Sequence, residues 1–280
     1  MSIFEAIILG LTQGASEFAP ISSSGHLILV PWFLGWPVLG GDTDLNKTFD
    51  VALHMGTLLG ALLYFRRDVW RYLTAWVRTL GRRRIETVDE RIAWALVVGT
   101  LPGVVLGATF EDLIQDNLGE PALIAAMLAV FGVVLWWVDR RMGSDRDLTT
   151  IGPRTGLFLG TAQALALQPG ISRSGITMTA ARAIGLDREA AARFSFLLSM
   201  PIIAGAGVYK GFDLVGEGFQ GYGAQFLSGF VAAAISGFVV IWGLLTYLKR
   251  HDYSVFMWYR LGVAGLAFAL IVRGVREATI

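Results

Sequence analysis

Gln13-Gly-Ala-Ser-Glu17-Phe-Ala-Pro20-Ile-Ser22-Ser23-Ser24-Gly25-His26 is a polar stretch inside sequence that is otherwise almost continuously apolar. A carboxylate, an imidazole and several hydroxyls at membrane depth are costly unless they face a cavity, a partner or a ligand. The stretch therefore predicts a functional site, and the apolar sequence around it predicts that this site lies within a membrane.

A second polar stretch, from Gln163 to Thr177, repeats the first one position by position. The identical pairs are Leu9/Leu159, Gly10/Gly160, Gln13/Gln163, Ile21/Ile171, Ser22/Ser172, Ser24/Ser174 and Gly25/Gly175. The informative differences are Glu17 against Leu167, Ser23 against Arg173 and His26 against Ile176. One stretch thus holds the acid and the imidazole while the other holds the cation, which favours a composite site for bond cleavage over a balanced carrier site.

The composition of the whole chain indicates a polytopic membrane protein. Of the 280 residues, 54% are hydrophobic and 16% are charged, whereas soluble domains carry about 25% charged residues. The net charge of +1 gives no indication of a nucleic-acid partner. The absence of cysteine excludes disulfides and thiol chemistry. Because the N-terminus lacks a basic leader and a cleavage site, we expect the first apolar segment to remain in the mature protein.

The pattern of apolar segments predicts an all-α fold. Two segments, 2–14 and 27–34, are each too short for the roughly 20 residues of a span, and Pro20 interrupts them. We therefore expect a re-entrant broken-helix hairpin, with its irregular backbone lining a cavity. A second hairpin is expected at 155–186, and about six full spans at 49–65, 92–110, 121–138, 193–209, 224–248 and 256–272. The prediction is one membrane domain over residues 1–280, with repeat one at about 1–138 and repeat two at about 150–280.

Charge placement predicts the topology of these spans. The segment 66–84 is rich in arginine and is expected in the cytoplasm, where its aromatic residues favour a helix along the membrane surface. The segment 111–120 is acidic and lacks Lys and Arg, so we expect it on the opposite side. Three crossings then separate the two hairpins, which predicts inverted repeats whose tips meet near the midplane, as in secondary transporters.

Both polar turns have the features of an anion site. Each precedes an apolar helical segment, whose free N–H groups and positive dipole end attract phosphate. Arg173 can hold two phosphate oxygens. Gln13 and Glu17 are one helical turn apart and share a face, from which they could reach a phosphate-bound divalent cation.

The same residues also have structural readings. Glu17 and Arg173 could form only an ion pair, and the serines could be helix caps. His26 could either contact Ser23, which is three residues away, or hydrogen-bond a carbonyl. His54 lies outside both stretches and is expected to pack or hydrogen-bond locally. Asp50 and Asp147 are expected to be charges that flank the spans.

Three ordered motifs resemble those of the bacitracin-resistance type of undecaprenyl-diphosphate phosphatase, and the resemblance covers essentially the whole chain. The motifs here run from Gln13 to Glu17, from Pro20 to His26 and from Pro169 to Thr177. The resemblance implies removal of the terminal phosphate from a C55 polyprenyl diphosphate lipid with Mg²⁺ or Ca²⁺, which recycles the carrier for peptidoglycan synthesis and confers bacitracin resistance. It also implies a bacterial plasma membrane protein, a site that opens to the extracytoplasmic side, and a homodimer.

The resemblance implies a role for each matched position. The catalytic residues are Glu17, Ser23, His26 and Arg173, and the substrate-binding residues are Gln13, Ser22, Ser24, Gly25, Gly170, Ser172, Ser174, Gly175 and Thr177. Glu17 is the expected metal ligand, through the substrate phosphates. The family pattern allows Gln at position 13 in place of Glu, which removes one metal-binding charge.

The nucleophile stays open between Ser23, His26 and a water that His26 activates. The rival function is a lipid-phosphate flippase or an anion transporter that uses the same inverted-repeat site.

Overall fold

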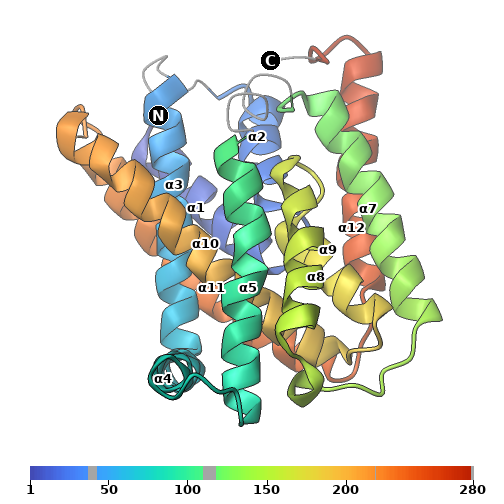
Figure 1. The fold of residues 1–280 in the computed structure, drawn as a ribbon. Coiled ribbons are helices and arrows are strands. Elements are labelled where there is room, and N and C mark those ends of the chain that lie inside the picture. The colour runs from blue at the N-terminus through green and yellow to red at the C-terminus, as the bar shows by residue number, and fades with distance from the viewer. Residues whose placement is uncertain (37–42, 110–117, 218, 279–280) are drawn as a thin grey trace.

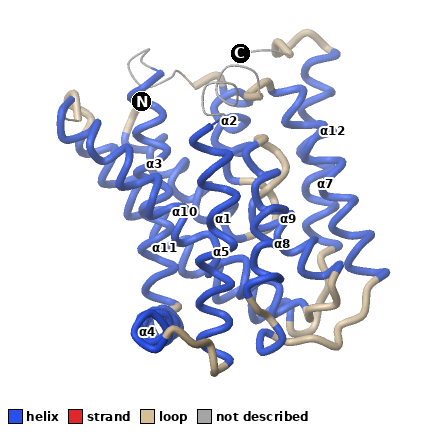
Figure 2. The backbone as a smooth tube through the Cα atoms, in the orientation of Figure 1, coloured by secondary structure: helices blue, strands red, loops and turns tan. Residues whose placement is uncertain are grey.

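The structure, a computed structural model, describes residues 1–36, 43–109, 118–217 and 219–278, with side chains for all but 43–44 and 210–217. The α-helices are α1 (Ile3–Phe18), α2 (Ser23–Leu34), α3 (Thr43–Tyr64), α4 (Arg66–Arg82), α5 (Val88–Thr109), α7 (Pro121–Arg141), α8 (Pro153–Ala164), α9 (Arg173–Ala183), α10 (Arg188–Glu217), α11 (Gly223–Leu248) and α12 (Ser254–Val272). Two 3-10 turns, η2 (Leu148–Thr150) and η3 (Leu165–Leu167), complete the elements. Within the described ranges there is no strand, only an isolated bridge between Arg146 and Leu186 (Figure 2).

The long helices confirm the prediction of an all-α, multi-pass membrane protein. Five of them, α5, α7, α10, α11 and α12, are long and apolar enough to cross a membrane. A sixth span results if α3 and α4 are counted together, although these two helices meet at 85°. Most of the acidic segment 111–120 lies outside the described residues.

Helix α4 lies across the ends of its neighbours (Figure 1). It buries Tyr72, Ala75 and Thr79 on one side, and its Trp70 is 69% exposed on the other. Two contacts hold it to α5: Trp94 Nε1 donates to Thr79 Oγ1 at 2.8 Å, and Arg71 pairs with Asp89. This amphipathic pattern is the one expected of a helix at a membrane surface.

Two pairs of short helices occupy the middle of the bundle. In the first pair, α1 ends at Phe18 and α2 begins at Ser23. In the second, α8 and η3 end at Leu167 and α9 begins at Arg173. The non-helical backbone between the partners carries the polar residues that the sequence singled out.

Close backbone contacts fix where each short pair sits. Helix α1 packs along α11, and α8 packs along α5. A Cβ atom on Gly10 would meet the carbonyl of Gly229, and one on Gly160 would meet the carbonyl of Gly99. Only glycine allows helices to approach this closely, which is the usual route to tight helix packing in membranes.

A buried charge cluster fixes the far end of α9. Asp139 of α7 accepts from Arg182 Nε at 2.7 Å and from Arg188 Nη2 at 2.9 Å. Arg182 is 1% exposed and also donates to the carbonyls of Gly143 and Leu186. The cluster ties α7, α9 and α10 together, because a buried charge without its partner is strongly destabilising.

Asp147, which is expected to be a charge that flanks the spans, has a local structural role between α7 and α8. Its carboxylate caps η2, accepting from the hydroxyl of Thr149 at 2.5 Å and from the amide of Thr149 at 3.0 Å. These hydrogen bonds hold the pKa of Asp147 below its usual value.

Candidate active site

The two polar turns have the same backbone geometry. Ser22 has φ 76° and Ser172 has φ 78°, both in the region that side chains rarely adopt. Ser22 Oγ accepts from the amide of Gly25 at 3.3 Å, and Ser172 Oγ accepts from the amide of Gly175 at 3.1 Å. Both serines are therefore helix caps, and the positive end of a helix begins at each turn.

The two turns lie directly against each other. Ser22 Oγ also accepts from the amide of Gly170 at 3.0 Å, and Ser174 Oγ donates to the carbonyl of Ala19 at 3.1 Å. Ser172 and Ser174 join their hydroxyls at 3.2 Å. The predicted binding residues of the two stretches, far apart in sequence, thus form one buried contact.

A buried arginine that the sequence analysis did not identify fastens this contact. Arg260 of α12 is 0% exposed. It donates to the carbonyl of Pro20 at 3.2 Å in the first turn, and to those of Gly170 at 2.7 Å and Ile171 at 3.1 Å in the second. Its Nε donates to the carbonyl of Leu128 at 2.9 Å. No carboxylate pairs with it in the described part of the chain, so its charge adds to the positive field at the turns.

Glu17 is the centre of the polar contacts on the other side of the turns. Its side chain is almost completely buried. Oε2 accepts from Ser23 Oγ at 2.6 Å and from Gln13 Nε2 at 3.1 Å. Arg173 Nη2 lies 3.4 Å from Oε1. Glu17, Ser23 and Gln13 come from the first stretch, and Arg173 comes from the second. The structure therefore brings the predicted acid, hydroxyl and cation together.

His26 points away from this cluster. Its Nδ1 lies 2.7 Å from the carbonyl of Ser22, and its Nε2 lies 2.9 Å from the hydroxyl of Tyr259 in α12. A carbonyl only accepts, so Nδ1 carries the proton and Tyr259 donates to Nε2 when the ring is neutral. The suggested contact between His26 and Ser23 is therefore wrong for this structure: Ser23 bonds Glu17, and both nitrogens of His26 are occupied.

His54 lies next to Glu17, a position that the sequence did not predict. It comes from α3, outside both stretches, and its Nε2 lies 3.5 Å from Glu17 Oε2. Its Nδ1 lies 2.8 Å from the carbonyl of Asp50, which orients the ring. The expectation of a purely local role is thus corrected: the local hydrogen bond exists, and the other ring nitrogen lies beside the Glu17 carboxylate.

A cavity of about 220 Å³ opens beside Glu17, with His54, Arg173 and Gln163 in its wall. Gln163, the counterpart of Gln13, is 3% exposed, and neither its oxygen nor its nitrogen has a hydrogen-bond partner among the described residues. Buried amides are almost always satisfied. An unpartnered amide in a cavity wall beside an arginine therefore points to a polar ligand.

The remaining predicted residues support the turns. Thr177 is fully buried, and its hydroxyl donates to the carbonyl of Arg173 at 2.8 Å, which holds the first turn of α9. Ser24 is half-buried at the start of α2 and makes none of the described contacts between the turns. The serines thus have different roles: Ser22 and Ser172 cap helices, Ser174 links the two turns, and the Ser23 hydroxyl bonds the Glu17 carboxylate.

The protein groups at the site are too few to hold a divalent cation by themselves, but they could hold one together with a bound phosphate ligand. The described residues include no cluster of three or more His, Cys, Asp or Glu side chains. The available donors are the Glu17 carboxylate and Gln13 Oε1, a buried oxygen without a described hydrogen-bond partner. Mg²⁺ is commonly held by one or two protein groups plus substrate phosphates and water, so these residues fit a cation that is carried by a phosphate ligand.

Comparison with known proteins gives matches over nearly the whole chain. The undecaprenyl-diphosphatase of Pelotomaculum thermopropionicum is 43% identical over 273 residues, with 97% of each chain covered. That of Moorella thermoacetica is 44% identical over 270 residues, covering 96% of this chain and 98% of the relative. That of Thermobifida fusca is 42% identical over 276 residues, covering 98% and 92%. The model of the family described as Bacitracin resistance protein BacA matches residues 6–266, and the chain belongs to that family.

Proposed function

We propose that the protein hydrolyses undecaprenyl diphosphate to undecaprenyl phosphate and inorganic phosphate. The names of the relatives support this reaction and do not favour transport. The observation that carries the proposal is the 2.6 Å hydrogen bond from Ser23 to the buried carboxylate of Glu17, beside Arg173 in a cavity wall. The reaction regenerates the monophosphate carrier for peptidoglycan synthesis and accounts for bacitracin resistance.

Ser23 is the nucleophile that the contacts favour. Its Oγ forms a bond to the terminal phosphorus while its proton passes to Glu17 Oε2. The bond to the bridging oxygen breaks, with its electron pair left on the lipid phosphate, and Glu17 returns the proton to that phosphate. A water then cleaves the phosphoserine, giving one proton to Glu17, which restores the Ser23 hydroxyl.

Positive charge and oriented amides stabilise the phosphate. Arg173 lies 3.4 Å from Glu17, a loose pair that leaves its guanidinium able to turn toward phosphate oxygens. The N-termini of α2 and α9 begin at the two touching turns, and the positive end of a helix stabilises negative charge on phosphate. Gln163 Nε2 supplies a further donor from the cavity wall.

The two histidines have different roles in this mechanism. His54 faces Glu17 Oε2 and stabilises the carboxylate as it gains and loses a proton. His26 holds the first turn in place through the carbonyl of Ser22 and through Tyr259. This assignment favours Ser23 over His26 as nucleophile, because Nε2, the nitrogen of His26 with a lone pair, would have to give up its hydrogen bond from Tyr259 to attack.

A bound Mg²⁺ or Ca²⁺ would supply charge neutralisation for the diphosphate. Glu17 and Gln13 Oε1 are the residues that would hold it. Gln13 meanwhile orients the carboxylate, since its Nε2 donates to Glu17 Oε2 at 3.1 Å.

We also infer that the two halves are inverted repeats with re-entrant hairpins. Three observations support this: the matching caps at Ser22 and Ser172, the reciprocal packing of α1 on α11 and of α8 on α5, and the matching glycine contacts at Gly10 and Gly160. The arginine-rich α4 supports a cytoplasmic position for its end of the bundle. The bacterial plasma membrane, an extracytoplasmic opening of the site and a homodimer follow from the family resemblance.

Phosphate release in detergent micelles tests the proposal, because micelles have no two sides and cannot report transport. The purified protein is expected to convert undecaprenyl diphosphate to the monophosphate. Ser23→Ala should lower the rate at least about 10³-fold, as removal of a nucleophile does. Ser228→Ala is the matched control, because among the described residues the Ser228 hydroxyl bonds a carbonyl of its own helix, that of Gln225. If the wild-type protein moved the lipid across vesicle membranes but released no phosphate in micelles, the proposed phosphatase function would be rejected.

A further inference from the structure

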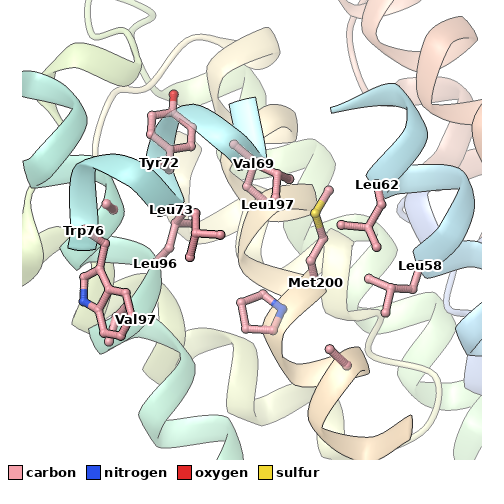
Figure 3. Close-up of a pocket in the computed structure, with 13 residues that line it drawn as sticks. Leu58, Leu62, Val69, Tyr72, Leu73, Trp76, Leu96, Val97, Leu197 and Met200 are labelled. Atoms are coloured by element: carbon pink, nitrogen blue, oxygen red, sulfur yellow. The ribbon is translucent and has the colours of Figure 1, made fainter. Parts of the chain in front are cut away.

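A second, apolar cavity lies under α4. It measures about 280 Å³, and Figure 3 shows its walls converging from α3, α4, α5 and α10. Leu58 and Leu62 come from α3, Leu73 from α4, and Leu197 and Met200 from α10. The exposed atoms of this wall are almost entirely carbon, so the cavity suits a hydrocarbon and offers no site for a charged group.

The apolar cavity and the candidate active-site cavity are lined by successive parts of the same helices, α3, α5 and α10. On α3, His54 lines the active-site cavity, and Leu58 and Leu62, one and two turns further on, line the apolar one. On α5, Gly103 lines the first and Leu96 the second. From Val51 to Leu62 the helical rise gives a path of about 16 Å.

Helix α10 crosses between the two cavities, and its crossing point carries small residues. Figure 1 shows α10 running diagonally across the space between α3 and α5. Both helices pack on α10 but not appreciably on each other. Ala204 lines the apolar cavity, Ala206 lines the active-site cavity, and Gly205 lies between them in sequence; Gly205 and Ala206 are exposed. A Cβ atom on Gly205 would meet no atom within 4 Å, so open space lies above it.

We propose that the polyprenyl tail of the substrate runs from the active-site cavity over Gly205 into the apolar cavity under α4. The inference rests on the proposed function, since it needs a diphosphate held beside Arg173. A tail attached to that diphosphate has to leave a cavity whose wall combines Arg173 and His54 with apolar side chains. The small-residue crossing gives it a route that stays within apolar surface and ends in a pocket whose exposed wall is almost entirely carbon and holds no charged side chain. The first few isoprene units fit this length, and the rest of the tail lies in the bilayer.

Filling the crossing point tests the route. Gly205→Phe places a ring in open space on a helix, and Gly265→Phe is the matched control, because Gly265 of α12 is equally exposed and equally without neighbours. Both variants are assayed in micelles with geranyl, farnesyl and undecaprenyl diphosphate. Gly205→Phe should raise the KM for undecaprenyl diphosphate roughly tenfold or more, as a steric mismatch in an apolar pocket does. The rise in KM should shrink as the tail shortens. Gly265→Phe should leave the KM for all three substrates at the wild-type value.

An equal effect of Gly205→Phe on all three substrates, or no effect on any, would overturn the route. Failure of the wild-type protein to cleave any of the three would instead reject the proposed function. The two failures are therefore distinguishable in one set of assays.

Labelling of introduced cysteines gives a second test that needs no catalysis. The natural sequence contains no cysteine, so Ala204→Cys and the control Gly265→Cys each create a single reactive thiol. Undecaprenyl diphosphate should slow maleimide labelling at position 204, while inorganic diphosphate should not, and position 265 should be unaffected. Protection at position 204 by a plain phospholipid to the same degree would assign the groove to bulk lipid and contradict the proposal.

Discussion

Replacing Arg260 by Met removes a buried side chain that donates to carbonyls of both polar turns. The side chains have similar length and both fill the space beside Gly132, so the change mainly removes donors and charge. Three turn carbonyls, those of Pro20, Gly170 and Ile171, lose the donor that Arg260 gives them. The carbonyl of Leu128 loses a donor too, but it lies inside α7, where a helix bond remains available.

The magnitude follows from the burial of these carbonyls. Each buried polar group left without a partner costs about 1–3 kcal/mol. The gain from no longer burying a charge offsets part of the sum, and we expect a net loss of about 3 kcal/mol in the free energy of unfolding. For a chain of this size that corresponds to an apparent Tm lowered by roughly 5–10 °C.

Thermal unfolding in detergent and phosphate release below the lowered Tm measure the two consequences. Activity should fall at least about tenfold even where Arg260→Met is folded, because the turns no longer hold Ser23 and Arg173 in register. Arg260→Lys keeps the charge with fewer donors and should lie between the two proteins. A folded Arg260→Met variant with the wild-type Tm and the wild-type kcat/KM would refute the role assigned to this arginine.

Three further variants follow from the site and its supports. His54→Asn should lower kcat about 10²-fold through loss of the group that faces Glu17, with little change in KM, and a wild-type kcat would remove His54 from the mechanism. Gln163→Leu should lower kcat/KM about 10- to 100-fold, the worth of one hydrogen bond to a charged group, without lowering the Tm; unchanged kinetics would show that its amide meets no ligand. Asp139→Asn should destabilise the protein by about 3 kcal/mol, because Arg182 and Arg188 lose their shared carboxylate, and its KM below the Tm should stay unchanged; a wild-type Tm would contradict this.

The local structure of the site could be predicted from sequence because it depends on short-range features. Pro20 and the serines after it interrupt a helix wherever they occur, and a serine before an apolar segment caps it. The internal repeat supplied the second turn, and the differences within that repeat identified Glu17 and Arg173 as residues that belong together. The structure places them 3.4 Å apart.

The rest of the site depends on packing between distant helices, which local patterns do not encode. His54 and Leu58 both look like ordinary positions of an apolar span, and only the approach of α3 to α1 turns one of them toward Glu17. Arg260 resembles an interfacial arginine at the start of α12 until its burial between the turns is seen. The repeat did contain one unused signal: Gln163 matches Gln13, and its conservation between the halves could have placed it in the cavity.

The most direct test of a composite site is a double-mutant cycle between its two halves, measured as phosphate release from undecaprenyl diphosphate in micelles. Ser23→Ala removes the proposed nucleophile from the first turn, and Arg173→Ala removes the cation from the second. Residues that act as one unit are not additive, so the double variant should be about as slow as the slower single variant. Two losses that multiply in full, or an Arg173→Ala variant at the wild-type rate, would contradict the claim that both turns form one catalytic site.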